Sequence, residues 1–114
     1  MTKNPLSAGR RSIELAAALA VGIAAGSAWA AEVAVTQKDR AFSVKEITLH
    51  PGDELVMHND DTRAHNIQIT NPKLTFNSGL QEPGEDARVR FAEPDRYLVF
   101  CGIHPKMKLW VDVR

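Results

Sequence analysis

Cysteine is nearly absent from this chain, which has 114 residues and a single cysteine, Cys101. One cysteine excludes a disulfide within the chain, although small exported domains often take part of their stability from disulfides. The thiol could be buried and inert, it could join two chains, or it could bind a metal. The cysteine count alone favours burial, because a free cysteine behaves as a small apolar side chain.

Apolar runs long enough to cross a membrane are also absent. The run from Leu15 to Ala25 has eleven residues, whereas a membrane-spanning helix needs about 20. Basic residues precede this run, and Ala28-Trp29-Ala30 follows it, which is typical of a secretory signal peptide. We therefore predict that residues 1–30 are a signal peptide cleaved after Ala30 and that residues 31–114 form one domain exported to the periplasm. The Sec and twin-arginine routes both remain open, since Arg10-Arg11 only loosely resembles a twin-arginine signal.

Neither sign of charge dominates in the predicted mature chain. Residues 31–114 contain 11 Lys and Arg and 13 Asp and Glu, which gives a formal charge of −2. No basic patch or run is visible, so the sequence excludes nucleic-acid binding and binding to anionic membranes through charge. A chain of this size allows one domain with a modest core. We predict a monomer without stable membrane insertion.

Helical periodicity is scarce after Ala31. Short segments of alternating apolar and polar residues are separated by turn residues such as Pro51-Gly52-Asp53 and Glu93-Pro94-Asp95. This arrangement is typical of an all-β sandwich or barrel, and about eight short strands fit. The segments with this alternation are 33–35, 42–49, 55–57, 65–69, 87–91, 96–101 and 109–113.

The candidate chemistry lies in one short stretch, where Cys101, His104 and Met107 follow one another at steps of three. Thiolate, imidazole and thioether are soft or borderline ligands, and two histidines with one cysteine and a weak axial methionine make the blue-copper set. A loop this short can surround only one side of an ion, so a second histidine must come from elsewhere in the fold. His65 is the best placed. We predict a site of His65, Cys101, His104 and Met107, with copper favoured over zinc because thioether donors suit copper.

The two-residue period of a strand predicts how these ligands face. His65, Cys101 and Met107 each share a face with an apolar neighbour (Ile67, Val99 and Leu109, respectively), so all three should point inward. His104 lies in the middle of a loop and should be the ligand nearest to solvent. Taken singly, each residue has an ordinary structural explanation, such as core packing or a satisfied buried polar group. Together, at these spacings, they favour a metal site.

Residues 101–107 are called the ligand loop below, and other pieces of sequence accompany it. A Pro-Gly-Asp turn joins two apolar segments between Ile47 and Leu55, His65-Asn66 opens a strand, and Tyr97 to Cys101 leads into Cys-x-x-His-Pro-x-Met. Together they resemble the cupredoxin family of small blue-copper proteins, most closely its amicyanin, pseudoazurin and plastocyanin branch, over nearly all of residues 31–114. The loop is similar to the short ligand loop of amicyanin. The resemblance implies a Greek-key β-sandwich of about seven to eight strands and one type 1 copper.

The resemblance also implies roles for residues beside the ligands. The backbone N–H of Asn66 should donate to the Cys101 sulfur, and the Asn66 side chain should tie the two ligand-bearing loops together. Gly102 stands where the family often has Ser or Thr, so a hydroxyl hydrogen bond between these loops is missing. His50 and His58 lie beside turns among polar residues, and we predict that they are solvated and bind no second metal.

A one-electron carrier is the function that the resemblance implies, shuttling Cu(I)/Cu(II) between redox partners such as a dehydrogenase and a cytochrome c. These partners would dock near His104 and Pro105. A periplasmic copper-handling protein for storage or delivery is the alternative, although such proteins use clusters of methionine or histidine and this chain has three methionines. An enzyme would need an open coordination position and a substrate pocket, or a second copper. The sequence offers neither, so we predict no catalytic residue.

Overall fold

The computed structural model describes residues 30–114, and the predicted signal peptide lies outside these residues except for Ala30. Residues 30–114 form strands and no helix, and therefore contain no helix that could cross a membrane. The strands are β2 (Glu32–Lys38), β3 (Ala41–Phe42), β4 (Glu46–Leu49), β5 (Glu54–Asn59), β6 (Ile67–Asn71), β7 (Leu74–Asn77), β8 (Asp86–Arg90), β9 (Asp95–Cys101) and β10 (Lys108–Val113).

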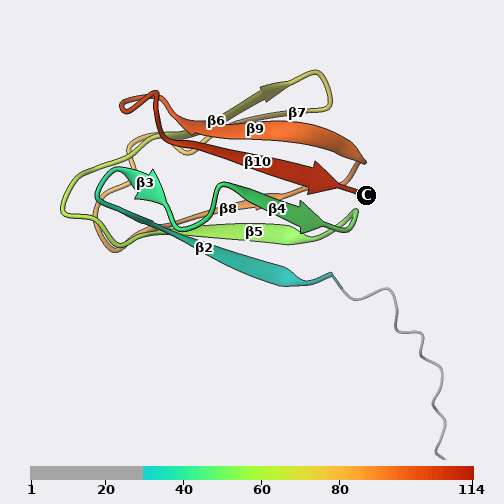
Figure 1. Cartoon of the computed structure of the whole chain (residues 1–114), viewed down its shortest axis with the longest axis horizontal. Helices are drawn as coiled ribbons and strands as arrows, with labels where there is room; N and C mark the ends of the chain where they lie inside the picture. Colours follow the sequence, from blue (N-terminus) through green and yellow to red (C-terminus); the bar gives the residue numbers. More distant parts are fainter. Residues whose placement is uncertain (1–29) are drawn as a thin grey trace, which may run out of the picture.

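Two sheets pack face to face and form a sandwich (Figure 1). One sheet has the strand order β4-β10-β9-β6-β7 and the other has the order β3-β2-β5-β8. The chain crosses between the sheets after β3, β4, β5, β7 and β8, which is the kind of connection found in Greek-key sandwiches. The predicted all-β sandwich is confirmed, with nine strands in the described part of the chain rather than seven or eight.

Two strand predictions differ from the structure. The segment 42–49 is two strands: β3 pairs with β2 in one sheet, whereas β4 pairs with β10 in the other. Ser43 marks the end of β3, where its backbone N–H donates to the carbonyl of Thr36 at 2.8 Å. Strand β7 was not predicted, because it has only four residues and its apolar side chains, Leu74 and Phe76, are only half-buried at the edge of the sheet.

The core between the sheets fixes strand β9, which leads into the ligand loop. Tyr97 and Val99 are fully buried, and so is Cys101 two residues further along the same face. The Tyr97 ring packs edge to face on Phe91 at 5.1 Å between centroids, and its hydroxyl donates to the carbonyl of Glu93 at 2.7 Å. A hydroxyl bonded to backbone just upstream resembles the tyrosine corner of other sandwiches. The position of Cys101 therefore follows from core packing.

Four connections meet at one end of the sandwich, opposite the C-terminus (left in Figure 1). They are the β2–β3 turn and the loops between β5 and β6, between β7 and β8, and between β9 and β10. The β5–β6 loop contains His65, and the β9–β10 loop contains His104. Segments 39 residues apart in the sequence therefore meet at this end.

Candidate metal centre

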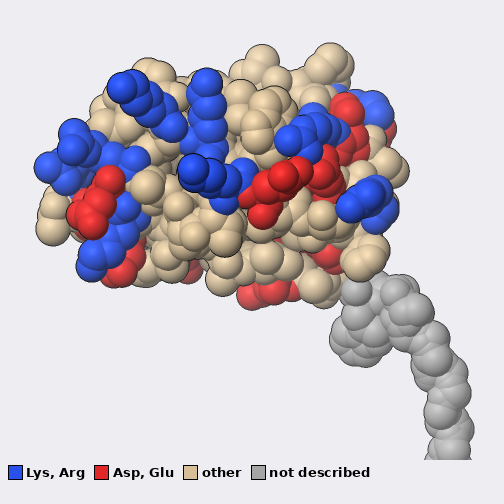
Figure 2. All heavy atoms as spheres, in the orientation of Figure 1, with Lys and Arg blue, Asp and Glu red and all other residues tan. Residues whose placement is uncertain are grey.

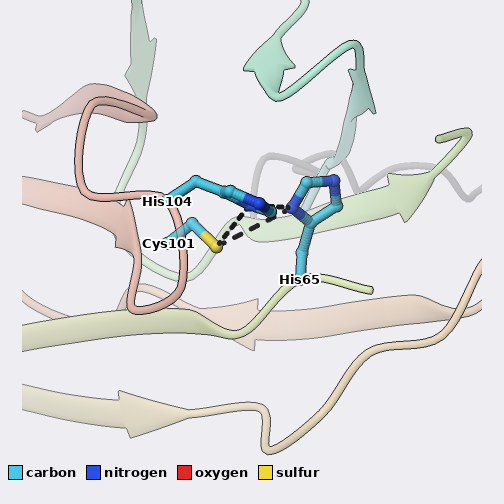
Figure 3. A group of neighbouring side chains, drawn as sticks. All are labelled: His65, Cys101 and His104. Atoms are coloured by element: carbon cyan, nitrogen blue, oxygen red, sulfur yellow. Dashed lines mark hydrogen bonds between the residues drawn. The ribbon is translucent and has the colours of Figure 1, made fainter. Parts of the chain in front are cut away.

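Three of the four predicted ligands point at one another across the end of the sandwich (Figure 3). The Nδ1 atoms of His65 and His104 are 3.2 Å apart, and each lies 3.7 Å from the Cys101 sulfur. His65 lies between β5 and β6, Cys101 ends β9, and His104 lies in the following loop. The histidine predicted to come from a distant segment is therefore next to the cysteine.

The triangle has the dimensions of a metal site. A point equidistant from the three atoms is about 2.1 Å from each, close to the bond lengths of a first-row metal such as zinc, about 2.0–2.1 Å to nitrogen and about 2.3 Å to sulfur. With their Nδ1 lone pairs turned toward this point, the two neutral imidazoles could both bind a cation placed there. One soft sulfur and two borderline nitrogens in a plane suit copper.

His65 is held by backbone and side-chain hydrogen bonds and is fully buried, as predicted. Its backbone N–H donates to the carbonyl of Gln81 at 2.9 Å, and the Gln81 N–H donates back at 2.7 Å. The His65 side chain places Nε2 3.0 Å from a carboxylate oxygen of Asp61. A carboxylate can only accept, so it keeps the proton on Nε2 and leaves Nδ1 free to bind a metal.

Asp61 is the functional residue that the sequence analysis missed. Its side chain is 2% exposed. The pKa of its carboxyl is lowered to about 2 from 3.8, first by the backbone N–H of Arg40 (2.9 Å), then by that of Thr62 (2.8 Å) and by His65. These hydrogen bonds outweigh burial, which raises the pKa. The available signal was the polar run Asn59 to Thr62 directly before a candidate ligand.

The Cys101 sulfur accepts a hydrogen bond from the backbone N–H of Asn66 at 3.4 Å, as predicted. The predicted role of the Asn66 side chain is wrong. Its amide donates to the side chain of Asn77 and to the carbonyl of Gly79, so it ties the His65 segment to the end of β7 instead of to the ligand loop. A backbone hydrogen bond also joins the two segments, because the Gly102 N–H donates to the carbonyl of Asn66 at 2.8 Å.

Little space is left for a side chain at Gly102. A Cβ atom at this position would lie 2.6 Å from the Asn66 carboxamide oxygen and even closer to the Gln68 amide nitrogen. Two side chains from the neighbouring segment therefore fill the space beside Gly102. The Ser or Thr that the sequence lacks could not be added without moving Gln68.

Of the three residues in the triangle, His104 lies nearest to solvent, as predicted, since it is half-buried while His65 and Cys101 are fully buried. The pKa of its imidazole is lowered from 6.5, first by burial and then by the neighbouring His65 and the positive charges of Arg40 and Arg63. Both effects favour the neutral ring that binds metal.

Met107 is 2% exposed and belongs to the core, so its predicted inward direction is confirmed. Its backbone closes the ligand loop. The Met107 N–H donates to the carbonyl of His104 at 2.9 Å, and its own carbonyl accepts from Cys101 at 3.2 Å.

The other two histidines lie away from this centre. The His50 side chain is 85% exposed, which agrees with the prediction of a solvated residue. His58 is half-exposed and also pairs with Asp86 at 2.7 Å, which was not predicted. Within residues 30–114, His65, Cys101 and His104 form the one group of three or more His, Cys, Asp or Glu residues that could hold a metal.

Comparison with known proteins gives a related sequence and several related folds. A chloroplastic plastocyanin from Silene latifolia subsp. alba is 28% identical over 105 residues, and the match covers 81% of this chain and 64% of that protein. This chain therefore spans less than two thirds of the length of that relative.

Solved structures show the same fold at low identity. An amicyanin mutant in its reduced Cu(I) form has a TM-score of 0.68 at 20% identity over 73% of this chain and 82% of that one. A purple cupredoxin from Nitrosopumilus maritimus has a TM-score of 0.63 at 22% identity over 71% of this chain and 98% of that one. A copper-containing nitrite reductase from Thermus scotoductus SA-01 has a TM-score of 0.67 at 23% identity over 73% of this chain but only 22% of its own.

A family model covers most of the chain. Residues 12–111 match the model described as a cupredoxin-like domain. The match includes the sandwich except the end of β10, and all three residues of the triangle, so sequence, fold and site point to one family. The chain belongs to the cupredoxin family.

Proposed function

We propose that this cupredoxin is a periplasmic one-electron carrier that holds one type 1 copper ion through His65, Cys101, His104 and Met107. The observation that carries the proposal is the triangle of the Cys101 sulfur and two imidazole nitrogens, whose sides of 3.2, 3.7 and 3.7 Å fit a metal ion. Copper bound there would alternate between Cu(I) and Cu(II) and so carry one electron. Cupredoxins generally transfer electrons, and both the plastocyanin match and the Cu(I) amicyanin structure support this reading.

Each residue would have a separate role. Cys101 would bind as the thiolate, with the Asn66 N–H reducing its negative charge through a hydrogen bond. Asp61 would keep His65 in the tautomer with a free Nδ1. Met107 would be the weak axial ligand, which its burial at the closed end of the loop supports. His104, half-exposed, would be the path by which the electron enters and leaves.

Export is supported by one contact at the predicted cleavage point. The backbone nitrogen of Ala31 lies 3.0 Å from an Asp53 carboxylate oxygen, and Asp53 is 5% exposed. Cleavage after Ala30 would convert that nitrogen into an ammonium group, which would strengthen the contact. Mass spectrometry of the protein recovered from the periplasm should therefore give a chain that begins at Ala31.

Copper storage or delivery remains the second function, but few additional soft donors are available. Among the described residues, the other methionine is Met57, which is fully buried in the core. An enzyme like the nitrite reductase is less well supported, because that match covers only 22% of the enzyme's chain. A domain of this size would correspond to one part of such a protein.

Addition of Cu(II) to the purified protein tests the proposal. One equivalent should bind and give an intense blue colour, reduction should bleach it, and reoxidation should restore it. Cys101→Ala should stay folded but colourless, because its core is supplied by other residues and only the thiolate is lost. A protein that binds copper without colour, or releases it on each reduction, would support copper handling instead.

A further inference from the structure

Asp53 carries a buried carboxylate in the turn directly before β5, at the end of the sandwich away from the ligand loop. One carboxylate oxygen accepts from the Ala31 N–H at 3.0 Å, and the other accepts from the His50 N–H at 2.8 Å. The pKa of this carboxyl is lowered, first by the N–H of Ala31 and then by that of His50. The group is therefore a buried negative charge at neutral pH.

This charge lacks a permanent cation within the part of the chain that the structure describes. Across residues 30–114, His50 is the one Lys, Arg or His with a side-chain nitrogen within 4.0 Å of the Asp53 carboxylate, at 3.8 Å, and its ring is exposed. An exposed imidazole is mostly neutral at pH 7. The other buried carboxylate of these residues, Asp61, has the Arg63 guanidinium 3.6 Å away. Buried charges are normally paired, so Asp53 lacks the kind of partner that Asp61 has.

The predicted cleavage point lies directly beside the Asp53 carboxylate. Ala30 and Ala31 are both exposed and precede β2, so the peptide bond between them lies outside the sheet. Hydrolysis of this bond by a signal peptidase consumes one water, leaves a carboxylate on Ala30 and turns the Ala31 nitrogen into an ammonium group. The new positive charge would arise 3.0 Å from a carboxylate oxygen that is already in place.

The first half of β2 is held on one side only, so an attachment at its start matters for the sheet. Residues 32–37 pair with β5, whereas β3 pairs only with the far end of β2. The carbonyl of Ala31 accepts from the Glu54 N–H at 2.9 Å, and its nitrogen donates to Asp53. Strand ends near a chain terminus open most easily. A stronger contact at Ala31 would therefore stabilise the start of β2.

We propose that Asp53 is the receptor for the N-terminal ammonium group of the mature chain, and that removal of the signal peptide therefore stabilises the fold. The inference rests on the proposed export and cleavage after Ala30, and it adds that the processed chain is more stable than its precursor. In the precursor the Ala31 nitrogen is a neutral amide that donates one hydrogen bond. In the mature chain it is an ammonium group, and a charge-assisted hydrogen bond is about twice as strong as a neutral one.

The surrounding charge is mixed and does not replace this receptor. The charged and titratable side chains at this end of β2, β5, β8 and β10 and in the turn are Glu32, His50, Glu54, Arg88, Arg90 and Arg114. Arg88 lies 3.1 Å from both Glu32 and Glu54, so these charges largely compensate one another. On the face that Figure 2 shows, Lys and Arg lie among Asp and Glu at the end where β2 begins in Figure 1. The Asp53 carboxylate itself must therefore account for the effect.

Acetylation of the N-terminus tests the proposal, because it reproduces the neutral amide of the precursor in an otherwise identical chain. The protein that begins at Ala31 and its N-acetylated form would be compared by thermal unfolding at pH 7. We expect the free form to have a folding equilibrium constant about fivefold larger and a melting temperature about 4–8 °C higher. An ion pair raises the pKa of an amino group, so this stabilisation is present below about pH 8 and is lost as the pH rises through the raised value. The two forms should melt together at about pH 10.

Asp53→Asn removes the charge of the receptor and keeps its size. Acetylation should then have little effect on the melting temperature, because neither form can make the ion pair. Glu32→Gln is the matched control, since it removes an exposed carboxylate from the residue next to Ala31, and it should leave the effect of acetylation nearly intact. If Asp53→Asn does not fold, an NMR titration of the Ala31 amino group in the unsubstituted protein serves instead. A pKa no higher than that of an unstructured peptide would overturn the inference.

The failures of the two proposals can be told apart. If the exported protein begins elsewhere than at Ala31, the proposed cleavage point is wrong and the inference falls with it. If it begins at Ala31 but acetylation acts equally on the unsubstituted protein and on Asp53→Asn, or has no effect, the receptor is wrong and export stands. The blue colour tests the electron-carrier function separately, because β2 begins at the end away from the ligand loop and acetylation should leave the colour unchanged.

Discussion

The contact between Asp61 and His65 leads to a quantitative prediction for Asp61→Asn. The substitution keeps the shape of the side chain and removes its charge. Asparagine can turn either a carbonyl or an amino group toward Nε2, which lies 3.0 Å away. If the amino group faces the ring, the proton moves to Nδ1, which is the nitrogen that must bind copper. The variant therefore weakens the selection of the tautomer that binds copper.

Asp61→Asn should change two quantities, the stability of the fold and the affinity for copper. The pKa of the Asp61 carboxyl is about 2 in the fold and 3.8 in a solvated aspartate, and this difference corresponds to about 2 kcal/mol of stability at neutral pH. For the metal, losing such a supporting group typically costs about 10- to 100-fold in affinity. A carboxylate favours the more highly charged ion, so the loss should fall mainly on Cu(II). The potential should then rise by about 60–120 mV, at about 59 mV for each factor of ten.

Cyclic voltammetry of the copper-loaded protein measures the change in reduction potential. Thermal unfolding of the metal-free protein measures the change in stability. Asp60→Asn is the matched control, because it makes the same chemical change one residue away, at an exposed position. Asp61→Glu should recover part of the potential if the carboxylate reaches the ring. Suppose that Asp61→Asn unfolds earlier but keeps its potential. Asp61 would then only stabilise the loop, and the argument about the tautomer would be refuted.

Three further substitutions test other parts of the structure. Met107→Gln should keep the blue colour and lower the potential, because an oxygen donor favours Cu(II); an unchanged voltammogram would make Met107 a core residue only. The pKa of Asp53 is lowered by the N–H of Ala31 and then that of His50, so its contribution to stability is complete above about pH 4 and is lost as the pH falls through the lowered value. Asp53→Asn should therefore melt earlier at pH 7 and show a flatter decline in acid. Gly102→Ala should destabilise the protein by about 1–3 kcal/mol in chemical denaturation, and adding Gln68→Ala should recover part of this loss; additive effects would mean that the two positions do not clash.

The inward direction of His65 and Cys101 could be predicted because strand alternation determines where a side chain points. Cys101 continues the buried face of β9, and the core holds that face in place. His65 was placed correctly in space although the local structure differs, since it lies in a bridge to Gln81 just before β6. The two-residue alternation of inward and outward side chains still applies at such a position, because it depends on burial and not on which partner supplies the backbone hydrogen bonds.

Contacts made by loops could not be predicted in this way. Asp61 reaches His65 across four residues of irregular chain, and the backbone N–H that lowers its pKa most comes from Arg40, 21 residues earlier. The Asn66 side chain bonds to Asn77 and Gly79, which belong to a hairpin that the sequence pattern did not reveal. Each contact depends on how two connections meet in space, and no local periodicity encodes this.

Arg40 connects the inside of the site with its surface. Its backbone N–H holds Asp61, which holds His65, while its side chain contributes positive charge beside His104. These two effects on the metal oppose each other: a fixed carboxylate favours Cu(II), whereas a nearby guanidinium favours Cu(I). Glycine at this position would remove only the second effect, because it keeps the N–H. A single residue in a strained turn (φ of 58°) therefore holds a buried carboxylate through its backbone and changes the electrostatic field at His104 through its side chain, and the two effects are separable by substitution.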